Sequence, residues 1–323
     1  MPQPTTQTGS PPGISVVIPC YNYARFLAQA VDSCLIQNYP AFEVIVVDDG
    51  SKDNTAEVAA KYGDRIRYIY QQNAGLPSAR NTGIKAARYP FVCFLDADDL
   101  FLPNYFTTIM QRLAGLTSDF GLIVANHEYV DIDGKPLANR RYDHEWNREI
   151  TVRDILIRSR FQPSGVITRR DIYEECGYFD PPLRSSEDRD MWIRITAKHR
   201  AWRMGDVFVQ IRKHGNNMSN NADRMRTNMR TVLVKSWRNQ VVPKGDVFFW
   251  LRVASFWCYQ TSLLYAGSGK RLTAYRDLIF SALLWPWFPR AERQNMPNYF
   301  RARSFVRYAL DAIRAGSASE PKA

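Results

Sequence analysis

The sequence predicts an α/β fold with a mainly parallel central sheet flanked by helices, followed by a C-terminal helical module. Three observations support this. Short apolar runs alternate with helical patterns over the first hundred residues, polar clusters follow four of these runs, and the alternation stops after about residue 215. Strands that alternate with helices at this spacing form right-handed βαβ units around a mainly parallel sheet.

The predicted strands are continuous apolar runs of the kind that is buried on both faces of a sheet. They span 14–19, 43–47, 66–70 and 91–95. A helix over 25–38 is indicated by the helical spacing of Leu27, Val31 and Leu35, and Tyr39-Pro40 ends it. Further helices are expected from Thr55 and over 79–88. Ligands of such sheets bind beyond the carboxyl ends of the strands, where the polar clusters fall.

The pattern of the C-terminal part predicts helices over 224–239, 247–265, 272–284 and 301–314. Residues 1–13 are rich in Pro, Thr, Gln and Ser, and residues 316–323 are small and polar, so both ends are expected to be disordered. We therefore expect a disordered lead-in (1–13), an α/β domain (14–215), a helical module (216–315) and a disordered tail (316–323).

The net charge of +11 is unevenly distributed. Residues 200–323 carry 21 Lys and Arg against 7 Asp and Glu, whereas residues 1–199 carry 22 against 25. A basic module on a mildly acidic domain indicates an anionic partner, which could be a membrane surface, a nucleic acid or a phosphorylated substrate. A solvated basic face without a partner is the alternative.

The five cysteines are odd in number and widely spaced, which indicates neither a disulfide framework nor a zinc site. The N-terminal residues lack the basic and apolar regions of a signal peptide. No stretch reaches the roughly 18 apolar residues that span a bilayer. We expect a cytoplasmic protein, with the inner face of the cell membrane as the alternative location.

Two carboxylates follow the run 91–95 at a spacing of two residues. Asp96 and Asp98 would project to the same side if the strand pairing continued, and they would repel each other without a cation between them. Hard oxygen ligands suit Mg²⁺ or Mn²⁺, which keep positions open for phosphate oxygens. The alternative is that Asp98-Asp99 cap the following helix.

A second acidic pair, Asp48-Asp49, follows the run 43–47 and precedes Gly50-Ser51. A carboxylate there could accept hydrogen bonds from a base N–H or a ribose hydroxyl. A turn with a helix N-cap is the competing interpretation. The pattern is not a Rossmann fingerprint, because no Gly-x-Gly-x-x-Gly follows the strand.

Five motifs in order resemble those of the inverting family-2 glycosyltransferases. They are Val17-Ile18-Pro19-Cys20-Tyr21-Asn22, Val46-Val47-Asp48-Asp49-Gly50-Ser51, Asn73-Ala74-Gly75 with Ala79-Arg80-Asn81, Leu95-Asp96-Ala97-Asp98-Asp99, and Ser186-Glu187-Asp188. The resemblance implies the A-type glycosyltransferase fold, with 14–215 as the catalytic domain. It also implies a nucleoside-diphospho-sugar donor, most often a UDP-sugar, and Mn²⁺ or Mg²⁺.

The resemblance also assigns roles to residues. Asp188, beside Glu187, would be the catalytic base, and Asp98, with His214 less firmly, would bind the metal. Ser185-x-x-Asp188 also fits a capping box, and a lone loop histidine is often polar surface. The expected nucleotide-sugar-binding residues are Pro19, Tyr21, Asn22, Asp48, Asp49, Asn73, Gly75, Arg80, Asp96 and Arg212.

One carboxylate suffices for inversion, because the metal stabilises the leaving diphosphate. The Gln-x-x-Arg-Trp motif of processive members is not present at Arg189-Asp190-Met191-Trp192. A single addition is therefore expected, to a saccharide or lipid-linked saccharide acceptor in bacterial-type polysaccharide or glycoconjugate assembly. The aromatic and cationic side chains of the C-terminal module suit an anionic membrane interface or the core of a helical subdomain.

Two other functions compete with this one. A sugar nucleotidyltransferase would need a Gly-rich, cationic phosphate loop after the first strand, and Cys20-Tyr21-Asn22-Tyr23 is not one. A nucleic-acid-binding protein could use the basic C-terminal third, but no recognised binding motif is present. We therefore expect no nucleic-acid partner.

Overall fold

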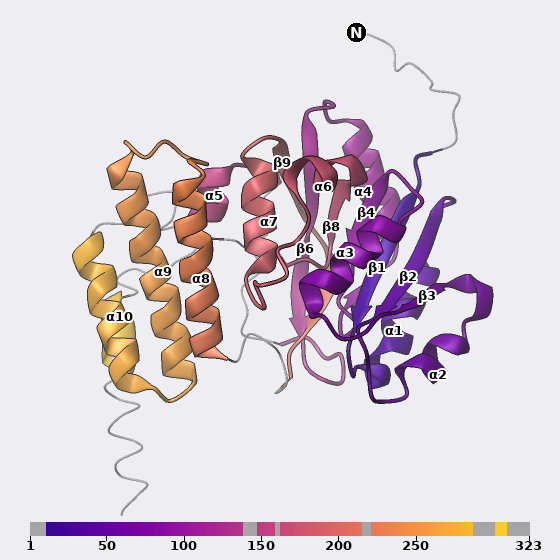
Figure 1. Ribbon diagram of the computed structural model, residues 1–323, viewed down its shortest axis with the longest axis horizontal. Coiled ribbons are helices and arrows are strands. Elements are labelled where there is room, and N and C mark those ends of the chain that lie inside the picture. The colour runs from indigo at the N-terminus through magenta and orange to yellow at the C-terminus, as the bar shows by residue number, and fades with distance from the viewer. Residues whose placement is uncertain (1–10, 138–146, 159–161, 215–220, 287–300, 309–323) are drawn as a thin grey trace, which may run out of the picture. The chain divides into compact units, whose positions relative to one another are not determined.

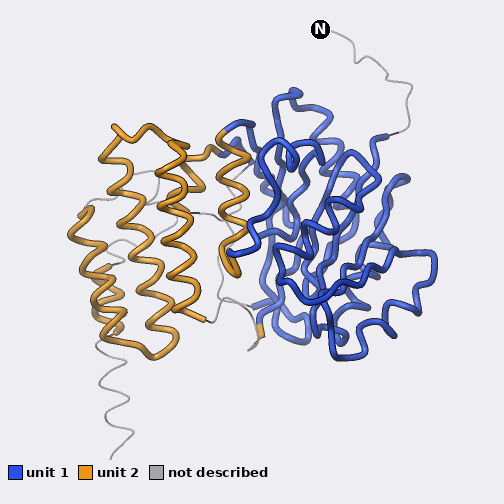
Figure 2. The backbone as a smooth tube through the Cα atoms, in the orientation of Figure 1, with its two compact units in different colours: residues 1–150, 161–182, 198–213 blue, residues 151–160, 183–197, 214–323 orange. Residues whose placement is uncertain are grey.

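The chain consists of two compact units in the computed structural model, which describes residues 11–137, 147–158, 162–214, 221–286 and 301–308. Unit 1 comprises residues 1–150, 161–182 and 198–213, and unit 2 comprises residues 151–160, 183–197 and 214–323 (Figure 2). Each unit is therefore built from several segments of the chain.

Unit 1 contains a mixed sheet with the strand order β3-β2-β1-β4-β8-β6-β9-β5, and β7 also pairs with β9. The first four strands are parallel, β8 runs antiparallel to both β4 and β6, and β5 and β7 run antiparallel to β9. The strands are β1 (Ile14–Cys20), β2 (Phe42–Asp48), β3 (Arg67–Tyr70), β4 (Phe91–Phe94), β5 (Leu100–Phe101), β6 (Phe120–Val130), β7 (Arg148–Ile150), β8 (Val166–Arg169) and β9 (Arg200–Arg212).

Helices cover both faces of this sheet (Figure 1). Along β1, Val16 and Ile18 face a core cluster that includes α1 (Ala24–Leu35), α2 (Thr55–Ala60) and α4 (Tyr105–Ala114), whereas Val17 faces α3 (Leu76–Ala86). On the α3 side, Phe94 of β4 packs edge-on against Tyr173 of α6 (Arg170–Cys176). The predicted fold class is confirmed, and the antiparallel part of the sheet is an addition to it.

Unit 2 is helical and is organised around one buried guanidinium. It contains α5 (Val152–Ile157), α7 (Glu187–Thr196), α8 (Ala222–Arg238), α9 (Val247–Gly267), α10 (Arg271–Leu284) and helical residues 301–308. Arg189 of α7 donates to the carbonyls of Ile155, Leu156 and Ile157 at 3.1, 2.9 and 3.0 Å. Its guanidinium also lies 3.9 Å from the ring centroid of Trp257. Burial lowers the pKa of Arg189 to about 9. The end of α5, whose last carbonyls have no partner within the helix, is thereby tied to α7 and α9.

The C-terminal helices predicted over 224–239, 247–265 and 272–284 are present as α8, α9 and α10. The helix predicted over 301–314 is described only through residue 308. The expected disordered ends fall largely on residues 1–10 and 309–323, which lie outside the described residues. No helix within the described ranges has both the length and the apolar character to cross a membrane.

We predict that Gly83→Ala destabilises unit 1, because a Cβ at this position of α3 would overlap the Val17 side chain of β1. Overpacking of this kind lowers the free energy of unfolding by about 1–3 kcal/mol, which urea denaturation would measure. Gly267→Ala in α9 is the control, because its Cβ would meet no atom within 4 Å. An equal loss in the two variants would contradict the close contact between α3 and β1.

Candidate active site

The polar clusters of unit 1 lie at the carboxyl ends of β2, β1 and β4, which are adjacent and parallel. The register pairs Cys20 with Asp48 and Val17 with Phe94, so the segments that follow these strands leave the sheet at one edge. The sequence prediction that these segments share an edge is therefore confirmed by the pairing.

Asp49 organises the segment that leads from β3 to α3. Its carboxylate is buried and accepts hydrogen bonds from Gln71 Nε2 at 2.6 Å, from the Ala74 N–H at 2.9 Å and from the Gly75 N–H at 2.8 Å. Asn73 Nδ2 donates to the backbone carbonyl of Asp49 at 2.9 Å. Gly75 has φ +91°, a conformation that side chains disfavour. Asn73 and Gly75 are thus held in place by the Asp49 residue.

The other residues around β1 and β2 divide into buried and exposed groups. Asp48 is buried and accepts from Tyr68 Oη at 2.6 Å and from the Ser51 N–H at 2.8 Å, which is the turn contact of the competing interpretation. Asn22 is exposed, has φ +57° and binds the Lys52 N–H through its Oδ1 at 2.7 Å. Pro19 is buried within β1, and the side chain of Tyr21 is exposed.

The chain turns directly after β4 instead of continuing as a strand. The Asp99 N–H donates to the Asp96 carbonyl at 2.9 Å, which closes a turn over residues 96–99. Asp96 and Asp98 were expected to share one side only if the strand pairing continued to them, and this condition is not met, because β4 ends at Phe94. The turn nevertheless concentrates three carboxylates in four residues, which the sequence had indicated.

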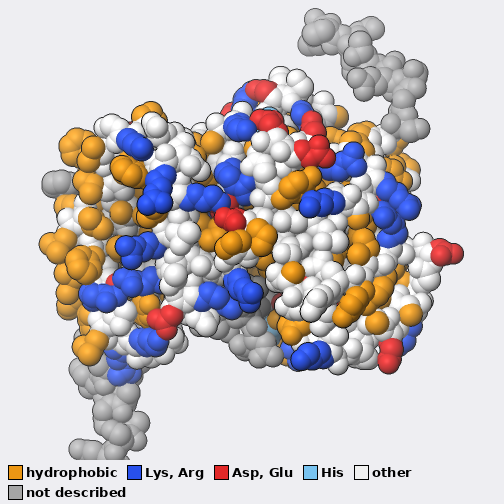
Figure 3. Space-filling view, viewed as in Figure 1, with side chains coloured by type: hydrophobic (Ala, Val, Ile, Leu, Met, Phe, Trp, Pro, Cys, Tyr) orange, Lys and Arg blue, Asp and Glu red, His pale blue; other side chains and the backbone are white. Residues whose placement is uncertain are grey.

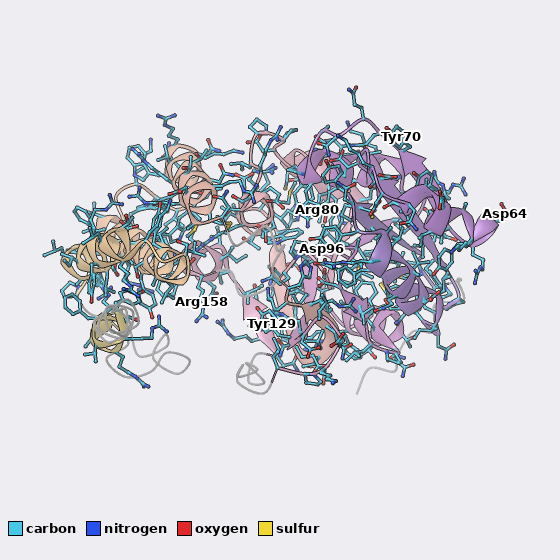
Figure 4. All side chains as sticks on the ribbon, turned by 90° about the horizontal axis from the view of Figure 1, so that it is seen from below. Asp64, Tyr70, Arg80, Asp96, Tyr129 and Arg158 are labelled. Carbon is cyan, nitrogen blue, oxygen red and sulfur yellow. The ribbon has the colours of Figure 1, made fainter. Side chains whose placement is uncertain are left out.

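Asp96 is held by a buried arginine. Arg80 Nη2 of α3 donates to Asp96 Oδ1 at 2.8 Å, and the Arg80 side chain is 1% exposed whereas that of Asp96 is 30% exposed (Figure 4). The guanidinium also lies 5.5 Å from the ring centroid of Phe179. Arg80 is thus placed to orient Asp96, and Asp96 is the more accessible of the two.

Asp99 and Arg212 form the deeper part of the cluster. Asp99 Oδ2 accepts from Ser164 Oγ at 2.6 Å, and its Oδ1 accepts from the backbone N–H of Arg212 at 3.1 Å. Burial, followed by the charges of Asp98 and Asp96, raises the pKa of Asp99 well above its usual range. The Arg212 guanidinium is buried, donates to Gln29 Oε1 at 2.7 Å and lies 4.5 Å from the Phe26 ring centroid. Burial lowers the pKa of Arg212, and the neighbouring carboxylates of Asp98 and Asp99 oppose this.

The two carboxylates predicted to be catalytic, Glu187 and Asp188, lie at the start of α7 in unit 2. Glu187 is buried, whereas Asp188 is half-buried. The alternative capping box is not formed: the N-cap is Ser186, which makes no side-chain cap. The Ser185 hydroxyl instead accepts from Asn228 Nδ2 of α8 at 2.9 Å. His214, the first residue of unit 2 after β9, is half-buried.

A group of potential metal ligands that the sequence did not indicate lies elsewhere in unit 1. Glu175, Cys176 and His199 offer ligand atoms within 4.8 Å of one another. His199 Nε2 lies 2.8 Å from Glu175 Oε2, and Lys198 Nζ lies 3.4 Å from Glu175 Oε1, so ion pairing already accounts for this group. The five cysteines, all of which lie within the described residues, are thiols that form no disulfide with one another.

Comparison with known proteins shows the family to which the chain belongs. The protein-family model described as glycosyl transferase family 2 matches residues 15–177 of the sequence, about half of the chain. The chain therefore belongs to glycosyl transferase family 2. An uncharacterized glycosyltransferase of Rickettsia typhi is 30% identical over 213 residues, which make up 65% of this chain and 67% of that protein.

Two solved structures share the fold. S. aureus TarS 1–349 in complex with UDP-GlcNAc has a TM-score of 0.58 at 18% identity and covers 86% of this chain and 93% of its own. The mannosyltransferase PcManGT of Pyrobaculum calidifontis in complex with GDP-Man and Mn²⁺ has a TM-score of 0.61 at 18% identity, with 96% and 90% covered. The chain thus shares the fold of these two proteins.

We predict that Asp49→Asn loosens the 73–75 segment. The carboxylate accepts three hydrogen bonds, and an amide would set an NH₂ group against one of these donors. The free energy of unfolding should fall by about 1–3 kcal/mol, as measured in urea. Asp64→Asn, at an exposed position of unit 1, is the matched control and should leave stability unchanged (Figure 4). A stable Asp49→Asn variant would disprove the organising role.

Proposed function

We propose that the protein transfers a sugar from a nucleoside-diphospho-sugar, with a UDP-sugar as the first candidate, to a hydroxyl acceptor with inversion at the anomeric carbon. The observation that carries the proposal is the 96–99 turn, whose Asp96 is held by Arg80 at the edge where β1, β2 and β4 end. Family membership and the nucleotide-sugar complexes of TarS and PcManGT support it.

The donor's nucleoside would be bound around Asp49, Asn73 and Gly75, and its ribose by Asp96. These groups are held by the Gln71, Ala74 and Arg80 contacts described above, so binding would require little rearrangement. Arg212 would bind the diphosphate, because its backbone N–H donates to Asp99 of the 96–99 turn and so holds the residue beside that turn. Pro19, Tyr21, Asn22 and Asp48 would complete this end of the site.

A divalent cation fits the donor set of the turn. Asp98 is half-buried and lies in the same turn as Asp96 and Asp99, so three carboxylates are close together there. Oxygen ligands of this kind suit Mn²⁺ or Mg²⁺, and we assign Asp98 as the protein ligand, with His214 as a second ligand. When bound, the cation would neutralise charge on the leaving diphosphate.

Asp188 would act as the base. Its carboxylate takes the proton of the acceptor hydroxyl as the oxygen bonds to the anomeric carbon and the bond to the diphosphate oxygen breaks. Asp188 is more accessible than Glu187, and its Oδ1 accepts the Arg189 N–H at 2.7 Å. We propose a single addition to a saccharide or lipid-linked saccharide in polysaccharide or glycoconjugate assembly.

We expect UDP to bind more tightly with Mn²⁺ or Mg²⁺ than in chelator, and Asp98→Ala to abolish this difference. Isothermal titration with UDP and, in parallel, GDP would measure the affinities, because the two solved neighbours bind donors with different bases. Asp133→Ala removes an exposed carboxylate of unit 1 and should keep the metal effect. Nucleotide affinity that is the same with metal and with chelator in the unmodified protein would refute the metal assignment.

We expect Asp188→Asn to fold and to bind donor normally but to lose transfer activity by roughly 10²–10⁴-fold, the usual effect of removing a general base. The variant keeps the size of the side chain, so the melting temperature should be unchanged. Glu174→Gln, an exposed position on α6, is the matched control and should retain full turnover. Near-normal turnover of Asp188→Asn would show that another group takes the proton.

A further inference from the structure

Helix α10 of unit 2 presents an apolar stripe to solvent. Leu272 is 88% exposed and Leu283 is 73% exposed, and Ile279 and Phe280 are about half exposed. These residues recur at the spacing of one helix face. Four adjacent large apolar side chains on a single exposed face are more than the scattered exposure that is normal for a folded protein.

The opposite face of α10 packs against the rest of unit 2, so the apolar stripe is not the face that forms the core of the unit. Asp277 is buried and accepts from Thr261 Oγ1 of α9 at 2.7 Å. Ser255 Oγ of α9 donates to the Ser281 carbonyl at 2.7 Å. Leu278 is also buried. These polar and apolar contacts therefore fix the orientation of α10, and in this orientation the apolar stripe faces solvent.

Two neighbouring segments add exposed apolar side chains beside α10. Phe305 and Val306 are about half exposed, and the Phe305 ring lies 5.0 Å from the Tyr275 ring of α10. At the start of α9, Phe248 is exposed and packs edge-on against Trp285, which directly follows α10. These residues and the α10 stripe together are called the α10 surface.

The charge around the α10 surface is mainly positive, although Lys270 is ion-paired to the exposed Asp223 of α8. Among the described residues 247–286 and 301–308, Asp277 is the only carboxylate, and it is buried and ion-paired to Arg226 and Arg276. Lys270, Arg276, Arg303 and Arg307 are exposed in the same ranges. Figure 3 shows hydrophobic side chains gathered over unit 2 with Lys and Arg beside them. Apolar side chains flanked by long cationic ones are the pattern of helices that lie in a membrane interface.

We propose that the α10 surface docks onto an anionic phospholipid bilayer, with Leu272, Ile279, Phe280 and Leu283 inserted among the acyl chains and the flanking cations at the headgroups. A second copy of this chain is disfavoured as occupant, because docking two α10 surfaces would bring like charges together. A nucleic acid would engage the cations but would leave the stripe in water. The proposal adds a lipid partner to the proposed transferase but does not depend on transfer.

The test is flotation of the full chain with phosphatidylcholine vesicles that do or do not contain phosphatidylglycerol. The unmodified protein should bind the anionic vesicles, and binding should weaken with salt. Ile279→Glu/Leu283→Glu should reduce the vesicle affinity by roughly tenfold or more, because two inserted side chains become charged. Arg303→Gln/Arg307→Gln should reduce the preference for anionic vesicles. Ile36→Glu, at an exposed apolar position of unit 1, is the matched control and should bind normally.

Three results would overturn the proposal: no binding to anionic vesicles at low salt, equal binding to neutral vesicles, or an equal loss in Ile36→Glu. Self-association of the unmodified chain that Ile279→Glu/Leu283→Glu abolishes, without any vesicle binding, would assign the α10 surface to a second copy instead. Melting curves would establish that each variant is folded. Because no nucleotide is present, failure here leaves the proposed transfer untouched, and a chain that binds vesicles but no nucleotide would refute only the transfer.

Discussion

Strand β1 is the element on which unit 1 depends, because it is buried on both faces and paired on both edges. Its neighbours β2 and β4 are both parallel to it, so the chain must leave all three strands in the same direction. The pairing of the three strands thereby collects the polar residues that follow them at one edge. Amino-acid substitutions that change the packing of Val17 against α3 would disturb the position of the segments at this edge.

The collected carboxylates would repel one another, and the structure offsets this with donors that are themselves fixed. Asp49 is satisfied by the Gln71 amide and two backbone N–H groups, Asp96 by Arg80, and Asp99 by Ser164 and a backbone N–H. Preformed partners of this kind lower the reorganisation that ligand binding requires. Asp98, in the same turn, is the carboxylate that we assign to the cation, and the groups around it are already oriented.

The sequence predicted the parts of the fold that local patterns determine. Continuous apolar runs identified β1 to β4, and helical spacing identified α1 and α8 to α10, because burial on one or both faces imposes these periods. The strands β6 and β8 and the helices α4 to α6 were not predicted. The place of these two strands in the sheet, with β8 antiparallel between β4 and β6, depends on pairing between residues that are far apart in the chain. Periodicity in the sequence does not encode such pairing. The apolar run 91–95 predicted the end of β4 to within one residue, but it did not predict the hydrogen-bonded turn over 96–99.

Motif order indicated which residues gather at the site, but not what each one does there. Arg80 and Arg212 were expected to bind the nucleotide sugar, and both guanidinium groups are buried against phenylalanine rings, as Arg189 is against Trp257. A guanidinium tolerates such burial because it is weakly hydrated and can stack on an aromatic ring while its N–H groups reach fixed acceptors. An ammonium group in these positions would lose the forked donor geometry, so lysine is not equivalent to arginine here. The amino-acid composition does not distinguish these buried arginines from exposed ones. Only the packing around them shows that they bind and orient neighbouring groups from within the core.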